Sequence, residues 1–147
     1  MLARDVMSSP VITLRPGVPV HAAAALLVSH GFTGAPVVDD EHRVIGIATE
    51  ADLVRGRIVP HGWIVDGQPA LTVAEVMTLS PAVMPPDSDL ADVVALMLDT
   101  GIRSVPIVDD GKLVGVVSRR DALRVVANGE ATSDDVRRRR HPTGDDQ

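Results

Sequence analysis

Two short segments place a hydroxyl and a carboxylate at the same spacing, and they are the strongest candidates for a functional site. Thr49 precedes Asp52 by three residues, and Ser118 precedes Asp121 by three residues. Each hydroxyl follows an apolar run at the expected start of a helix, where its oxygen would accept an unpaired backbone N–H. The carboxylate then lies in the first helical turn, where it complements the helix dipole. A hydroxyl and a carboxylate are therefore expected side by side at the end of a strand, twice in the chain.

The other reactive side chains show no spacing typical of catalysis or metal binding. The chain has no cysteine, which excludes disulfides and thiolate metal sites. Neither Ser8-Ser9 nor Ser80 has a positioned His or Lys that would make it a nucleophile. We therefore expect no enzyme active site and no metal site. The histidines, which share no metal-ligand spacing, are His21, His30, His42, His61 and His141.

Composition indicates a globular protein with an aliphatic core. The chain has 147 residues, of which 45% are hydrophobic, and Phe32 and Trp63 are the only aromatic residues. A net charge of −6 argues against binding to nucleic acid or to an anionic membrane. The longest apolar run, residues 22–28, is too short to span a bilayer, and no apolar signal core follows the first residues. We therefore expect a soluble, cytoplasmic protein without a membrane or nucleic-acid partner.

Each candidate site follows a predicted β-hairpin. Residues 105–108 and 113–117 are β-branched apolar runs joined by the turn sequence Asp109-Asp110-Gly111. The same pattern occupies residues 31–52, and its turn is one residue longer. The hairpin is therefore part of an internal repeat, and the length difference lies in a turn.

An amphipathic helix is predicted before each hairpin. Apolar residues fall on one helical face within residues 20–28, and the same spacing recurs within residues 90–98. Asp87-Ser88 is the candidate N-terminal cap of the second helix, and Gly31 and Gly101 are expected to end the two helices.

Each half reads strand, helix, strand, strand, helix, which predicts an α+β fold. The first strand of each half is predicted at residues 10–12 and 81–83. Because one half alone would leave a sheet face exposed, the two halves are expected to pair. We place the first repeat at 1–58, a linker at 59–71, the second repeat at 72–128 and a disordered tail at 129–147.

Together these features resemble the CBS domain, the module first recognised in cystathionine β-synthase, and the two halves resemble a CBS pair, or Bateman module. The resemblance rests on a Gly before the second strand, an apolar-x-Pro-apolar strand that ends in Asp, an apolar-Gly-apolar strand, and Ser/Thr-x-x-Asp at its end, all found twice in the same order. It implies tandem βαββα repeats with pseudo-two-fold symmetry and clefts between them. It also implies an adenosine ligand and a regulatory role.

The resemblance gives the two carboxylates a role. It implies that Asp52 and Asp121 accept hydrogen bonds from ribose hydroxyls, with Thr49 and Ser118 at the same ligand, and a carboxylate offers two acceptor oxygens to a vicinal diol. The alternative is that these residues only cap helices, and both descriptions can hold together. Small apolar residues are expected to line the adenine: Val11, Ile12, Ala35, Ala82, Val83 and Val105. The alternative is that these residues are ordinary members of the hydrophobic core and contact no ligand.

Two arginines predict that the sites are unequal. Arg103 and Arg120 lie near the second site, and a guanidinium suits phosphate because it donates two parallel hydrogen bonds. Their equivalents in the first half are the uncharged Thr33 and Ala51. The second site is therefore predicted to bind a phosphate-bearing ligand more tightly. The alternative is that both arginines are solvated surface charges.

We therefore predict a stand-alone regulatory sensor that needs no cofactor. It would bind an adenine nucleotide (AMP, ADP or ATP), signal to a partner protein of unknown identity, and form a homodimer. The alternative is an interaction scaffold that dimerises through its amphipathic helices and leaves its clefts empty.

Overall fold

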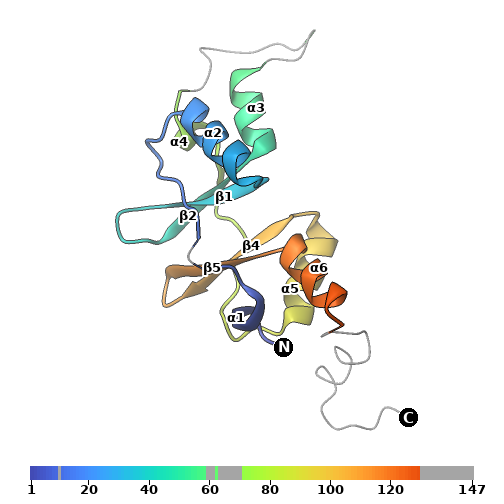
Figure 1. Cartoon of the computed structure of the whole chain (residues 1–147). Coiled ribbons are helices and arrows are strands. Elements are labelled where there is room, and N and C mark those ends of the chain that lie inside the picture. Colours follow the sequence, from blue (N-terminus) through green and yellow to red (C-terminus); the bar gives the residue numbers. More distant parts are fainter. Residues whose placement is uncertain (10, 59–61, 63–70, 130–147) are drawn as a thin grey trace, which may run out of the picture. The chain divides into compact units, whose positions relative to one another are not determined.

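The apolar runs of each half form the predicted β-hairpins (Figure 1). In this computed structural model, which describes residues 1–9, 11–58, 62 and 71–129, β1 (Gly34–Val38) pairs antiparallel with β2 (Val44–Thr49). In the second half, β4 (Ser104–Asp109) and β5 (Lys112–Ser118) form a two-stranded sheet. The fold is mixed helix and strand, with the strand-strand-helix pattern present in both halves, as predicted.

The two hairpin turns differ as the sequence predicts. Asp110 and Gly111 both have positive φ, 52° and 79°, which matches a tight turn of the Asp-Gly type. The longer first turn is organised by Asp39, whose Oδ1 accepts backbone N–H groups from Glu41 (2.8 Å) and Arg43 (2.9 Å). The N–H of Arg43 lowers the pKa of Asp39. The extra residue is absorbed by this turn and by an irregularity in the strand register beside it.

In the described part of the chain, four longer helices accompany the hairpins. α2 (Val20–His30) and α5 (Leu90–Thr100) precede them, and α3 (Glu50–Arg57) and α6 (Arg119–Ala127) follow them (Figure 1). α2 and α5 end, as predicted, at glycines in the left-handed conformation, where a side chain would be disfavoured.

The predicted N-terminal cap of α5 is wrong by one residue. The cap is Asp89, whose Oδ1 accepts the backbone N–H of Ala91 (3.0 Å). Asp87-Ser88 instead belongs to a turn, closed by a hydrogen bond from the N–H of Ser88 to the carbonyl of Pro85 (3.1 Å). The turn places the first helical residue after Asp89.

The predicted first strands are reduced to single bridges farther along the chain. Leu14 bridges Val37 in parallel, and Met84 bridges Ile107 in parallel, whereas residues 11–13 and 81–83 lie in no strand. A proline follows Met84 directly and another comes two residues after Leu14. Because proline cannot donate a ladder hydrogen bond, the pairing does not extend.

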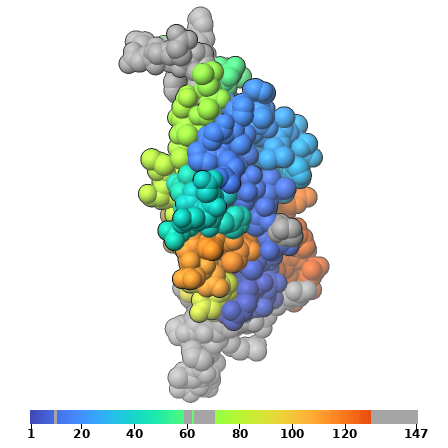
Figure 2. All heavy atoms as spheres, turned by 90° about the vertical axis from the view of Figure 1, so that its left-hand side faces the viewer, coloured from blue at the N-terminus to red at the C-terminus, as the bar shows by residue number. Residues whose placement is uncertain are grey.

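Two segments that the sequence left unassigned run along the hairpins, and we call them the leading segments. The first (residues 1–9) contains α1 (Ala3–Val6), and its Ser8 bridges Val116 of β5. The second (residues 71–80) contains α4 (Val73–Val76) and β3 (Thr78–Leu79), and β3 pairs with β2. Figure 2 shows the second leading segment (yellow-green) beside the chain around α2 (blue), where the N–H of Val20 donates to the carbonyl of Leu71 (3.0 Å).

A methionine of each leading segment packs directly against a glycine of a hairpin. A Cβ at Gly46 would lie 2.9 Å from both Met77 Sδ and the carbonyl oxygen of Thr78. A Cβ at Gly115 would lie 2.7 Å from Met7 Cγ. These glycines explain the apolar-Gly-apolar pattern of β2 and β5, because a side chain at either position would collide with the methionine that packs there.

The leading segments are exchanged between the two sequence repeats. Unit 1 comprises the described residues of Met1–Val11, Val83–Asp109 and Val114–Gln147, and unit 2 comprises those of Ile12–Ala82 and Asp110–Leu113. Each unit therefore takes its leading segment from the other repeat. The predicted linker and tail fall almost entirely outside the described residues.

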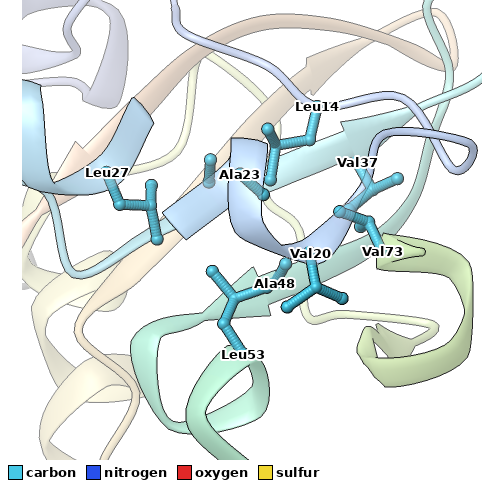
Figure 3. Packing of buried hydrophobic residues seen from close by; sticks show 9 residues of the cluster. Leu14, Val20, Ala23, Leu27, Val37, Ala48, Leu53 and Val73 are labelled. Carbon is cyan, nitrogen blue, oxygen red and sulfur yellow. The ribbon is translucent and has the colours of Figure 1, made fainter. Parts of the chain in front are cut away.

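Each unit has its own aliphatic core. In unit 2, residues from α2, β1, β2, α3 and α4 converge with Leu14 (Figure 3). The largest fully buried side chains of unit 1 are Met97 and Ile107. Among the described residues, no helix is long and apolar enough to cross a bilayer.

Candidate functional site

In unit 1 the predicted hydroxyl and carboxylate form a reciprocal cap at the start of α6. Ser118 is the N-cap residue, and its Oγ accepts the backbone N–H of Asp121 (3.1 Å). The carboxylate Oδ2 of Asp121 in turn accepts the backbone N–H of Ser118 (2.9 Å). This capping box fixes the carboxylate at the positive end of the helix dipole.

Two further donors converge on Asp121. Ser8, from the first leading segment, donates its hydroxyl to Oδ1 (3.2 Å), and Arg124 donates from Nη1 to the same oxygen (3.1 Å). Asp121 is only 3% exposed, whereas the Arg124 side chain is largely exposed. The buried charge is therefore compensated by a backbone N–H, a hydroxyl and a guanidinium.

Unit 2 repeats this arrangement without the hydroxyl of a leading segment. Thr49 and Asp52 form the capping box of α3, with distances of 3.0 Å from Thr49 N to Asp52 Oδ2 and 3.2 Å from Asp52 N to Thr49 Oγ1. Arg55 donates from Nη2 to Asp52 Oδ1 (2.7 Å), and Asp52 is 5% exposed. Thr78 occupies the position equivalent to Ser8, and within the described residues it donates no hydrogen bond to Asp52.

Three residues at these sites were not predicted from the sequence. Arg55 and Arg124 follow the carboxylates by three residues. This i,i+3 spacing on one helix face could have predicted both ion pairs from the sequence. Ser8 carried no local signal, because it lies 113 residues from its partner in the chain. The helix-cap description therefore holds at both sites, and it leaves a buried carboxylate that can accept further hydrogen bonds.

The predicted phosphate contacts lie near the first turn of α6. The backbone carbonyl of Arg103 accepts the N–H of Arg119 (2.9 Å), which places residue 103 at the start of this helix. Arg120 is exposed in the first turn itself. In unit 2 the carbonyl of Thr33 similarly accepts the N–H of Glu50 (2.8 Å). The start of α6 therefore has Arg103 and Arg120 near it in unit 1, whereas the start of α3 in unit 2 has the acidic Glu50.

The six residues predicted along the adenine differ in burial and in the unit to which they belong. The unit boundary passes between Val11 and Ile12 and between Ala82 and Val83, so each pair is divided between the units. Val105 and Ala35 are 0% and 3% exposed, and both belong to the hydrophobic cores. Val11 and Ile12 are half-buried, and Ala82 and Val83 are exposed.

The chemistry available at these helix starts is hydrogen bonding. A buried carboxylate accepts hydroxyl groups, and unpaired N–H groups of the first helical turn attract anions. Among the described residues, no group of three or more His, Asp or Glu side chains is arranged to hold a metal ion.

The chain belongs to the CBS domain family. A sequence model of the CBS domain matches it twice, at residues 3–58 and 73–128. An uncharacterized protein of Methanopyrus kandleri, MK0525, is 35% identical over 130 residues, which cover 82% of this chain and 60% of that protein. The chloroplastic CBS domain-containing protein CBSX2 of Arabidopsis thaliana is 31% identical over 134 residues, which cover 76% of this chain and 56% of that protein. The chain thus spans about half the length of such curated relatives.

Solved structures of CBS pairs share this fold. The structure of CBSX2 in complex with AMP is similar with a TM-score of 0.77 and 28% identity, covering 88% of this chain and 99% of that chain. The CBS domain pair of protein MJ0100, in complex with 5′-methylthioadenosine and S-adenosyl-L-methionine, is similar with a TM-score of 0.75 and 28% identity, covering 88% of this chain and 98% of that chain. Both structures contain adenosine compounds.

Proposed function

We propose that this chain is a regulatory CBS pair that binds an adenosine nucleotide, with the ribose at Asp52, Asp121 or both. The observation that carries the proposal is the buried, capped carboxylate at the start of α3 and of α6. A carboxylate in this position has a fixed orientation and is a strong acceptor for a vicinal diol. The adenosine compounds in the structures of CBSX2 and MJ0100 support the choice of ligand.

The proposed output is a signal to another protein rather than a reaction. Ligand binding can shift a conformational equilibrium only through different affinities for two states, so the partner must distinguish the bound from the free form. AMP, ADP and ATP are the proposed ligands, and the regulated partner is a separate chain or a further domain.

A nucleotide panel tests the ligand class. We expect AMP, ADP, ATP or adenosine at 100 times its dissociation constant to raise the free energy of unfolding by about 2.7 kcal/mol, measured by thermal melting. Adenine without ribose is the control, and it should give a much smaller shift because it lacks the diol. If no adenosine compound changes the melting temperature, the ligand-binding function is wrong.

A second function, dimerisation as a scaffold, is favoured by apolar side chains exposed on the helices. In unit 1, Leu98 of α5 is 68% exposed and Leu123 of α6 is 65% exposed. In unit 2, Val28 of α2 is 82% exposed. Exposed apolar groups on neighbouring surface helices are typical of an association surface.

We expect a homodimer at high micromolar concentration, and light scattering gives the mass directly. Leu98→Glu and Leu123→Glu should each shift the mass toward the monomer, because a charge would be buried in the interface. Leu79→Glu is the matched control, since Leu79 is equally exposed (66%) but lies on β3 rather than on a helix. A monomeric wild-type chain would contradict this prediction.

A further inference from the structure

The two carboxylates differ in how many of their acceptor positions are already used. An ionised carboxylate has about four lone-pair positions. Among the described residues, Asp121 accepts from three donors, which are Ser118 N, Ser8 Oγ and Arg124 Nη1. Asp52 accepts from two donors in the same part of the chain, which are Thr49 N and Arg55 Nη2. About one position is therefore left at Asp121, and about two are left at Asp52.

This difference matters for a vicinal diol, which donates two hydroxyl hydrogen bonds. Asp52 can accept both hydroxyls without losing a partner. Asp121 can accept only one, unless Ser8 turns its hydroxyl away. Ser8 is an exposed residue of the first leading segment, so water can solvate its hydroxyl when it leaves the carboxylate.

We propose that Ser8 is a specificity-determining residue that takes the place of one ligand hydroxyl at Asp121 and so makes unit 2 the tighter site for a ribose diol. The inference deepens the proposed function and rests on it. It separates two preferences. Unit 2 favours the diol, whereas the arginines at the start of α6 favour a phosphate in unit 1. Adenosine and AMP would then occupy the two units in opposite order.

The test isolates unit 1 by using Asp52→Asn as the background and measures binding by calorimetry. Adding Ser8→Ala should raise the affinity for adenosine about tenfold, the value of one hydrogen bond to a charged acceptor. The affinity for 2′-deoxyadenosine should not change, because a single hydroxyl needs only the one position already free.

The matched control is Thr78→Ala in the Asp121→Asn background, which isolates unit 2. It should leave adenosine affinity unchanged, since Thr78 does not occupy Asp52. If Ser8→Ala leaves adenosine affinity unchanged or lowers it, or strengthens both nucleosides equally, Ser8 does not compete and the inference is wrong while the proposed function stands. If no adenosine compound binds to either unit, both fail together.

Discussion

Asp121→Asn should remove the tighter of two calorimetric steps with AMP. Asn keeps one oxygen for the N–H of Ser118 but loses the charge, so the hydrogen bonds to the ribose weaken. Each hydrogen bond to a charged group is worth about 1.5–3 kcal/mol, which corresponds to a tenfold or larger loss of affinity. We place the tighter AMP site here because Arg103 and Arg120 lie at the start of α6, whereas the uncharged Thr33 and Ala51 hold the equivalent positions at the start of α3.

Two companion variants make this prediction specific. Asp52→Asn is the matched control, and it should affect AMP much less while removing the tighter adenosine step. Arg103→Ala should weaken AMP binding and spare adenosine, because a guanidinium contributes only to the phosphate. If Asp52→Asn proves more damaging to AMP, or if Arg103→Ala weakens both ligands equally, the phosphate-preferring site is not in unit 1.

Gly46→Ala should destabilise the fold by about 1–3 kcal/mol, the range for forcing an extra methyl group into a packed interior. The added Cβ would meet the Thr78 carbonyl oxygen at 2.9 Å, and this backbone group is held by the pairing of β2 with β3. Gly115→Ala should cost less, since the atoms nearest its Cβ belong to the Met7 side chain, which can adopt another rotamer.

Urea unfolding gives these free energies, and Gly17→Ala is the control. No atom of the described residues lies within 4 Å of a Cβ added at Gly17, and Gly17 has no positive φ, so its substitution should be neutral or slightly stabilising. Equal stabilities of Gly46→Ala and Gly17→Ala would show that the second leading segment does not pack against β2 as described.

The elements that local chemistry determines were predictable from the sequence. The hairpins follow from β-branched runs and an Asp-Gly turn, and the helix ends follow from Gly31 and Gly101. The caps Thr49 and Ser118 also follow from spacing alone, because a capping box involves residues only three positions apart. The prediction of the first strand in each half was wrong, also for a local reason, because nearby prolines limit the pairing to a single bridge.

What the sequence could not reveal depends on contacts between distant residues. The exchange of leading segments is invisible in a repeat whose two halves read alike, because either assignment satisfies the same apolar pattern. Ser8 meets Asp121 only as a result of that exchange. The two carboxylates therefore differ because Ser8 donates a hydrogen bond to Asp121, whereas Thr78 at the equivalent position donates none to Asp52 among the described residues. Only the folded chain brings Ser8 close to Asp121.

The exchange of leading segments also orders events during synthesis of the chain. Unit 2 is drawn from one continuous stretch, Ile12–Ala82, apart from the four residues Asp110–Leu113. Unit 1 joins both ends of the described chain. The first leading segment can therefore make its contacts in unit 1 only after α5, β4, β5 and α6 have left the ribosome. Residues 1–9 are thus made before the elements of unit 1 with which they pack. The carboxylate of Asp121 acquires its Ser8 donor only after α6, more than a hundred residues later in the chain, has been made.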